Sequence, residues 1–185
     1  MRVLQLIKHD FIAYKSNGNA FISKYGRFGV LKLFFTDASF RRLISIRLLS
    51  QSNIFYKCIG RIILRETRFL NTYIFCPNLG AGLYLMHAFS TIIAAKKIGK
   101  NCLICQQVTI GWSPSGEPTI GDNVKIFAGA KVVGGITIGN DVWISANAVV
   151  TKDVPDHCIV AGIPAKIIKK RENIYQKWHS VKETK

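Results

Sequence analysis

His87 is the residue of this 185-residue chain best suited to acid–base chemistry. It closes the segment Gly82–His87, inside the charge-free stretch from Asn71 to Ala95. An imidazole titrates near neutral pH, so it can take a proton from a hydroxyl group under ordinary conditions. A lone histidine in an apolar stretch is more often structural, so the assignment depends on the elements that surround it. The other histidines, His9, His157 and His179, lie in no comparable motif.

A second group of candidate residues lies between Gly111 and Thr119, in a stretch rich in Gly, Pro and Ser. Such a composition predicts a surface loop. The loop carries Trp112 and Glu117. A carboxylate at this place can hydrogen-bond a substrate hydroxyl or orient an imidazole; an ordinary solvated glutamate is the alternative.

A six-residue repeat must position both candidates. Aliphatic residues fall on every sixth position, and a second apolar residue follows each of them by four. A period of six fits neither an amphipathic helix nor an alternating strand, but it does fit a parallel β-helix. The first series comprises Ile120, Ile126, Val132, Ile138, Ile144 and Val150, and it extends back through Ile110, Ile104, Ile98, Ile92 and Leu85.

Two interruptions of the repeat coincide with the chemically interesting residues. The step from Leu85 to Ile92 is seven residues, which predicts one bulged residue beside His87. The step from Ile110 to Ile120 predicts a loop extruded from the coil. Glycine and asparagine recur where the coil should turn, and we expect them to supply unusual backbone conformations. These residues are Gly99, Gly121, Gly139, Asn101, Asn123 and Asn140.

The repeat is flanked by basic segments. Residues 1–71 are predicted to be helical, with helices over residues 40–51 and 54–69, a break and N-cap at Ser52-Asn53, and a loop over residues 17–29. Arg41, Arg42 and Arg47 are expected on the polar side of the first helix. Residues 167–185 are expected to form a short terminal helix that covers the open end of the repeat. The basic helices can lie on a membrane, on the β-helix or on a partner subunit.

Charge is distributed unevenly. The chain has 26 basic and 10 acidic residues, and almost all of the excess lies outside residues 79–162. Basic flanks suit an anionic surface, a phosphate-linked substrate or an acidic glycan, or they are simply solvated. The segment from Asn71 to Ala95 contains Asn, Pro, Gly and His, which argues against a membrane span. Five cysteines without an export signal indicate reduced thiols; Cys102 is expected to point inward and Cys105 outside the inward ladder.

Several motifs together resemble the left-handed β-helix acyltransferases of the hexapeptide-repeat type. The order and spacing are similar to the serine acetyltransferase branch, which includes O-acetyltransferases of capsule, exopolysaccharide and lipopolysaccharide synthesis. The resemblance covers about residues 72–170. It implies a mainly β fold with a left-handed β-helix over residues 72–166, the helical region 1–71 and the tail 167–185. The motifs are Gln106–Gly111, Pro118–Val124, Ala128–Val132, Ala146–Pro155 and Gly162–Lys166.

This resemblance implies direct transfer from acetyl-CoA, without a metal, in sites between the subunits of a homotrimer. His87 matches the family's catalytic histidine, which deprotonates the acceptor hydroxyl. Trp112 would flank the thioester or the acceptor. The pantetheine arm would run past main-chain groups near Gly111, Ala128 and Ala146, and Lys152 and Lys166 would meet the phosphates of CoA.

The chain departs from the serine acetyltransferases on the acceptor side. Thr72 stands where those enzymes have the aspartate that orients the histidine, Met86 replaces another aspartate, and Gly116-Glu117 replaces an arginine-histidine pair. We therefore expect a sugar hydroxyl of a surface polysaccharide or its precursor as the acceptor, with Glu117 assisting His87. Serine O-acetylation in cysteine biosynthesis is the alternative, and an inactive assembly or membrane-docking protein is another. We expect a cytoplasmic protein, peripheral to the plasma membrane, and no nucleic-acid partner.

Overall fold

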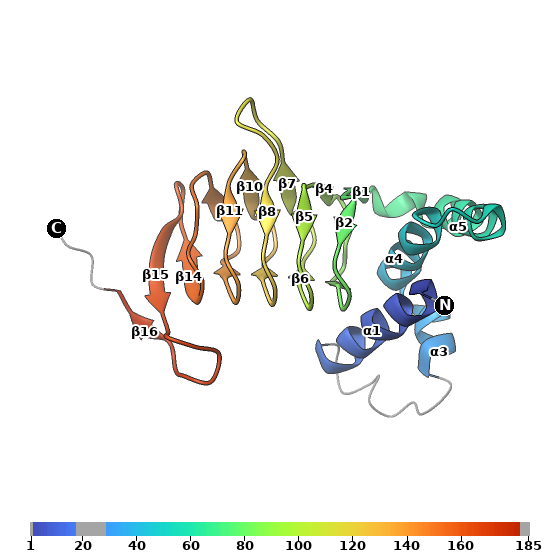
Figure 1. The fold of residues 1–185 in the computed structure, drawn as a ribbon, viewed down its shortest axis with the longest axis horizontal. Coiled ribbons are helices and arrows are strands. Elements are labelled where there is room, and N and C mark those ends of the chain that lie inside the picture. The colour runs from blue at the N-terminus through green and yellow to red at the C-terminus, as the bar shows by residue number, and fades with distance from the viewer. Residues whose placement is uncertain (1, 18–28, 182–185) are drawn as a thin grey trace.

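The computed structural model describes residues 2–17 and 29–181, and it consists of a parallel β-helix with helices at its N-terminal end and an antiparallel hairpin at its C-terminal end (Figure 1). The expected loop over residues 17–29 falls largely on residues 18–28, which lie outside the described residues. The helices are α1 (Arg2–Asn17), α3 (Gly29–Thr36), α4 (Ala38–Leu49), α5 (Ile54–Glu66) and the short η1 (Arg68–Leu70).

Three sheets form the walls of the β-helix, and each of the first four coils contributes one strand to each wall. Sheet 1 contains β1 (Tyr73–Phe75), β4 (Ile92–Ala94), β7 (Thr109–Gly111), β10 (Lys131–Val133) and β13 (Val149–Val150). Sheet 2 contains β2 (Asn78–Leu79), β5 (Lys97–Ile98), β8 (Thr119–Ile120) and β11 (Thr137–Ile138). Sheet 3 contains β3 (Tyr84–Leu85), β6 (Leu103–Ile104), β9 (Lys125–Ile126), β12 (Trp143–Ile144), β14 (Cys158–Ala161), β15 (Lys166–Lys170) and β16 (His179–Ser180). The last coil contributes β13 and β14, and it meets the second wall through an isolated bridge between Val154 and Ile138.

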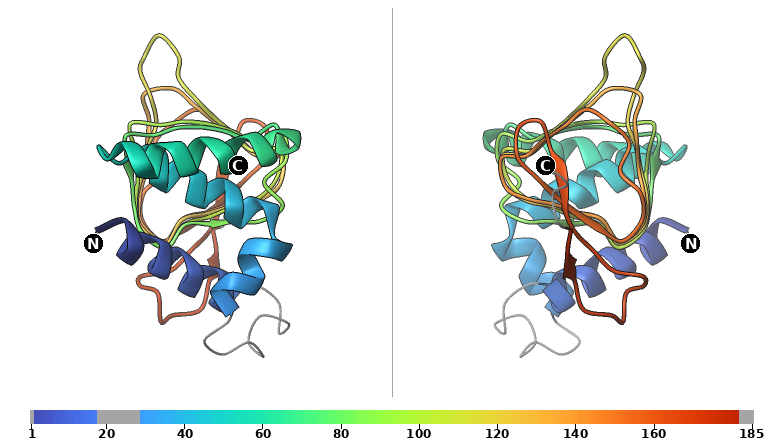
Figure 2. Two further views of the ribbon diagram at one scale, coloured as in Figure 1. Left: turned by 90° about the vertical axis from the view of Figure 1, so that its right-hand side faces the viewer. Right: turned by 90° about the vertical axis from the view of Figure 1, so that its left-hand side faces the viewer.

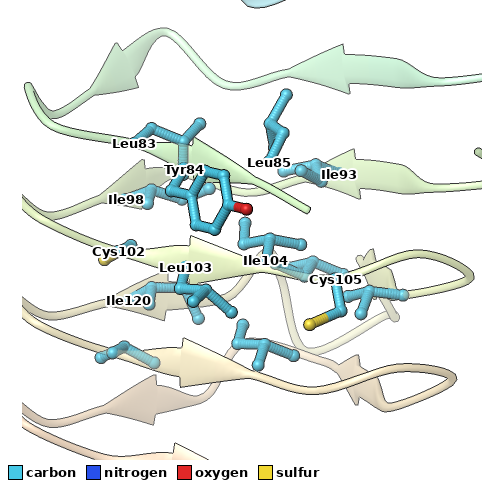
Figure 3. Close-up of a cluster of buried hydrophobic side chains, with 14 of the residues drawn as sticks. Leu83, Tyr84, Leu85, Ile93, Ile98, Cys102, Leu103, Ile104, Cys105 and Ile120 are labelled. Carbon is cyan, nitrogen blue, oxygen red and sulfur yellow. The ribbon is translucent and has the colours of Figure 1, made fainter. Parts of the chain in front are cut away.

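The repeat is confirmed as the core of the domain. From Ile98 to Val150 the predicted first-series residues are buried. Ile98 pairs with Ile120 of the next coil, and Ile104 pairs with Leu85 of the coil before it (Figure 3). Each buried isoleucine contributes about 1.5–3 kcal/mol relative to an exposed one. Viewed along the axis, the coils superpose and one loop projects beyond them (Figure 2); this is the extruded segment that follows β7.

The register of the second coil differs from the prediction. Ile93, not Ile92, pairs with Ile110 and is fully buried, whereas Ile92 pairs with Thr109 and is 45% exposed. The step from Leu85 to its inward neighbour is therefore eight residues, against six from Ile104 to Ile110. Two residues, not one, lengthen the corner that carries His87. Two adjacent isoleucines are equally apolar, so the pattern could not choose between registers that differ by one residue.

The corner glycines serve close stacking rather than unusual backbone angles. A Cβ atom on Gly99 would lie 2.4 Å from the carbonyl oxygen of Gly121, one coil further on. The left-handed backbone angles belong to the neighbouring column, which includes Asn101 and Asn123 as expected. In the next coil Asp141 (φ 54°) takes this conformation instead of Asn140.

The two predicted helices are confirmed as α4 and α5, and Asn53 is the N-cap of α5, accepting a hydrogen bond from Phe55 N at 2.8 Å. The expectation that Arg42 and Arg47 are on a polar face is wrong, because both are buried. Arg47 donates to Asp10 Oδ2 at 2.9 Å and to the carbonyl oxygen of Leu79 at 2.7 Å. Periodicity alone could not show that Arg47 is paired with Asp10, or that Arg42 donates to the carbonyl oxygen of Thr72 at the start of the first coil.

The C-terminal cap is a hairpin, so the predicted terminal helix is wrong. β14 pairs antiparallel with β15, which pairs antiparallel with β16. Buried Asp141 anchors this cap, accepting hydrogen bonds from His157 Nδ1 and Arg171 Nε, both at 2.8 Å. Burial works against the charge of Asp141, but the bonds from Arg171 and His157 outweigh it and lower its pKa. The Arg171 guanidinium also stacks on Trp178, 4.1 Å from the ring centre.

Across residues 2–17 and 29–181, no helix has the length and apolar character needed to cross a bilayer. The stretch from Asn71 to Ala95 instead supplies strands β1 to β4.

Candidate active site

The predicted site residues lie along two different edges of the β-helix. We define the His87 edge as the corner where the chain passes from sheet 3 to sheet 1, and the Glu117 edge as the corner where it leaves sheet 1 for sheet 2. His87, Ala128 and Ala146 share the His87 edge, in the first, third and fourth coils. The residues on the Glu117 edge are Gly111, Trp112, Glu117 and Lys152.

His87 is exposed and stands in a corner with unusual backbone geometry. Its own φ is 51°, and Ser90 also has a φ of 51°. Non-glycine residues adopt such values rarely and at an energetic cost, which the surrounding structure must offset. The carbonyl oxygen of His87 accepts from Phe89 N at 2.5 Å, and the carbonyl oxygen of Phe89 accepts from Gln107 N in the next coil at 3.1 Å.

Helix α1 holds the chain that leads into His87. The Tyr14 hydroxyl donates to the carbonyl oxygen of Leu85 at 3.0 Å and accepts from its N–H at 3.3 Å. Further back, Asp10 Oδ1 accepts from Gly82 N at 2.9 Å. Asp10 and Tyr14 were missed at the level of sequence, because nothing in a helix some seventy residues earlier marks them as partners of this corner.

The side chains beside His87 are uncharged. Met86 is half-buried, and its sulfur lies 3.9 Å from the Sγ of Cys105. Cys105 is outside the inward ladder as expected, yet it is buried, and burial raises its pKa. Thr72 is fully buried and hydrogen-bonds to the backbone after His87. Neither position offers a carboxylate to the imidazole.

The loop on the Glu117 edge is ordered by contacts that the sequence pattern did not reveal. Ser113 and Gly116 exchange two backbone hydrogen bonds, of 3.0 and 2.8 Å. Ser115 Oγ accepts from Gly135 N of the following coil at 2.9 Å. A sequence feature that could have indicated this contact is the pair of glycines at positions 134 and 135, one coil beyond the loop. Trp112 remains 68% exposed at the base of this loop.

Gly111 differs from the stacked corner glycines. A Cβ atom there would meet only Thr109 Cγ2, at 3.9 Å, which is an ordinary contact. Packing within the chain therefore does not require glycine at this position. The missing side chain leaves the backbone open to a ligand or to a neighbouring molecule.

Glu117 does not meet His87 within one chain, because the two lie at opposite borders of sheet 1. Its electrostatic neighbour is Cys76, whose pKa is raised chiefly by burial and further by the charge of Glu117. Any joint action of Glu117 and His87 requires a second copy of the chain.

Lys152 and Lys166 line one small cavity, of about 220 Å³, between the last coil and the C-terminal hairpin. Both side chains are exposed. In the part of the chain that is described, no three His, Cys, Asp or Glu side chains gather closely enough to hold a metal ion.

Comparison with known proteins identifies the family. Residues 117–152 match the family of bacterial transferase hexapeptide (six repeats). The chain is 41% identical, over 117 residues, to the serine acetyltransferase of Synechococcus elongatus, covering 60% of this chain and 48% of that protein. It thus spans about half the length of this curated relative.

Solved structures agree with this assignment. The serine acetyltransferase of Brucella abortus is 30% identical with a TM-score of 0.69, covering 90% of this chain and 68% of that one. A second structure of that enzyme, in complex with coenzyme A, is 25% identical with a TM-score of 0.68, covering 90% and 67%. The chain belongs to the hexapeptide-repeat acyltransferases. The quoted relatives are named serine acetyltransferases, so the expected closer match to the polysaccharide branch is not supported.

Proposed function

We propose that this protein is an acetyl-CoA-dependent O-acetyltransferase in which His87 is the general base. The observation that carries the proposal is the exposed imidazole of His87, held in a constrained corner on the same edge as Ala128 and Ala146. The names of the relatives and the coenzyme A bound to one of them support the same chemistry.

The reaction is a direct transfer. The imidazole of His87 takes the proton of the acceptor hydroxyl, and the oxygen attacks the thioester carbonyl of acetyl-CoA. The resulting tetrahedral intermediate collapses as the C–S bond breaks, and the imidazolium returns its proton to the departing thiolate. The products are an acetyl ester and free CoA.

Small side chains on both edges fit a long, thin co-substrate. Ala128 is half-buried and Ala146 is exposed, and each is followed by a residue with positive φ, namely Gly129 and Asn147. Together with Gly111 they leave main-chain groups open to the amides of a pantetheine arm. Lys152 and Lys166, around their shared cavity, would supply positive charge to the phosphates of CoA.

The site is complete only if the His87 edge of one subunit faces the Glu117 edge of another. A cyclic trimer repeats one such contact three times, which gives three equivalent sites. In this arrangement Trp112 and Glu117 of one subunit approach His87 of its neighbour. Mixing His87→Ala and Glu117→Ala subunits tests the arrangement. Activity recovered in the mixture supports shared sites, and no recovery contradicts them.

The relatives favour serine as the acceptor, because those quoted are serine acetyltransferases. A sugar hydroxyl is the second candidate, and a specific observation favours it. The two positions near His87 where serine acetyltransferases carry aspartate are uncharged here, as Met86 and Thr72. Glu117 is the one charge on the loop from Gly111 to Thr119. A zwitterionic amino acid needs fixed charges of both signs to be held, and a sugar does not.

The acceptor is decided by measuring thiol release from acetyl-CoA in the presence of L-serine and, separately, of a panel of glycans. Rapid release with serine alone establishes serine O-acetylation. Release with a glycan, and not with serine, establishes the second candidate. Release with neither, from protein that binds CoA, contradicts the proposed function.

We also propose that the helical region gives this enzyme an affinity for anionic membrane surfaces. Support comes from α5 and η1, where Phe55, Ile62 and Phe69 are each about two-thirds exposed. Exposed basic residues accompany them: Arg61, Arg65 and Arg68. A second copy of the same surface would bring like charges together, whereas an anionic bilayer neutralises them. Flotation with phosphatidylglycerol vesicles tests this; no flotation at low salt, or equal flotation of an Ile62→Ser variant, contradicts it.

A further inference from the structure

Both peptide groups of Ala88, the residue directly after His87, are held by side chains: one from helix α4 and one from the start of the first coil. The N–H of Ala88 donates to Ser39 Oγ of α4 at 3.1 Å, and its carbonyl oxygen accepts from Thr72 Oγ1. Ala88 and Thr72 are fully buried, and Ser39 is 5% exposed. Buried backbone groups require hydrogen-bond partners, so these two hydroxyls define where the peptide groups can lie.

Every corner on the His87 edge is tied to the preceding turn by a backbone hydrogen bond, and in the His87 corner Ser90 N donates to the carbonyl oxygen of Leu70 at 2.8 Å. Gly129 N donates to the carbonyl oxygen of Gln106 at 3.1 Å, and Asn147 N donates to that of Ala128 at 2.9 Å. What distinguishes the His87 corner is its length, since it is two residues longer than the others. Ala88 lies in this longer stretch, and its peptide groups are bonded by the hydroxyls of Ser39 and Thr72 instead. Without these two hydroxyls, Ala88 would be the least constrained part of the corner.

We propose that Ser39 and Thr72 are positioning residues for His87, which fix the backbone of Ala88 so that the imidazole is presented in one orientation. This inference rests on the proposed role of His87 as general base. Thr72 is itself fixed, because Arg42 Nη2 donates to its carbonyl oxygen. In this proposal His87 is oriented by restraints on its main chain, and not by a carboxylate that hydrogen-bonds its imidazole.

The test compares the variants Ser39→Ala and Thr72→Val with two controls. Ser45→Ala removes another buried hydroxyl from α4, one that donates only to the carbonyl oxygen of Arg42, at 2.7 Å. Thr72→Ser keeps the hydroxyl. We expect kcat to fall by about 10- to 100-fold in Ser39→Ala and Thr72→Val, with KM for acetyl-CoA changed less than twofold, because misplacing a reacting group mainly affects the chemical step. Ser45→Ala and Thr72→Ser should retain kcat within about twofold.

A second readout does not require turnover. Hydrogen exchange at the Ala88 amide should accelerate at least about tenfold in Ser39→Ala and not in Ser45→Ala, and the NMR signals of the His87 ring should shift only in the former. If the wild-type protein transfers no acetyl group, the proposed function fails, and these signals still decide the positioning. Equal kcat in Ser39→Ala and Ser45→Ala, or an Ala88 amide that exchanges alike in both, overturns the inference.

Discussion

Replacing Ile93 by alanine should destabilise this protein far more than replacing its neighbour Ile92. Ile93 is fully buried and pairs with Ile110, whereas Ile92 is 45% exposed and pairs with Thr109. The pair of variants tests the register of the second coil, and with it the two-residue extension of the corner that carries His87.

The magnitudes follow from burial. Ile93→Ala removes about three carbon groups from the core at about 0.8 kcal/mol each, and the cavity left behind adds about 1 kcal/mol or more. The expected cost is about 3–4 kcal/mol. Ile92→Ala removes the same groups from a half-exposed site without enclosing a cavity, which costs about 1 kcal/mol. Because both changes lower strand propensity equally, the difference of about 2–3 kcal/mol reports burial alone.

The assay is urea denaturation of both variants at several protein concentrations, so that a contribution from subunit association is recognised by its concentration dependence. The midpoint of Ile93→Ala should lie well below that of Ile92→Ala, with the slope unchanged. A larger, concentration-independent loss in Ile92→Ala would refute the register and restore the seven-residue step.

Two further changes test the cap and the glycines. Asp141→Asn should cost about 2–3 kcal/mol at pH 7, because it removes a charged acceptor of three hydrogen bonds, one from His157 and two from Arg171. The pKa of Asp141 is lower in the folded than in the unfolded protein. This stability is therefore present above about pH 4 and is lost as the pH falls through the folded pKa. The stability difference between the wild type and Asp141→Asn is measured by urea denaturation at pH values from 7 to 2. A difference that stays constant over this range contradicts the role given to the Asp141 carboxylate. Gly99→Ala should cost about 1–3 kcal/mol of stability, because the added Cβ atom would collide with the next coil. Gly111→Ala should leave the stability unchanged. It should instead weaken the binding of CoA, which calorimetry measures. Equal stability losses in the two glycine variants would contradict the distinction.

Most of the β-helix could be predicted from the sequence, because a period of six leaves one way to bury the aliphatic series. Prediction failed where neighbouring residues are chemically equivalent, as with Ile92 and Ile93. It also failed for the tail, whose structure depends on partners elsewhere in the chain. β15 pairs with β14, and Arg171 is held by Asp141, thirty residues earlier.

The candidate site was predictable residue by residue but not as an arrangement. His87 and Glu117 were marked by irregularities of the repeat, and the structure places them on separate edges. The groups that hold the His87 corner, including Asp10, Tyr14 and Ser39, belong to α1 and α4. Buried polar contacts between distant segments leave no periodic trace, and the same holds for Arg42 and Arg47, which charge patterning assigned to a polar face.

The most direct test of the central claim is the rate of thiol release from acetyl-CoA by the wild-type protein and by His87→Ala, with serine and glycans as acceptors and CoA binding measured by calorimetry in parallel. We expect kcat to fall by about 10²- to 10⁴-fold in His87→Ala, with the Kd for CoA unchanged. Turnover by His87→Ala within about threefold of the wild type would contradict His87 as the general base.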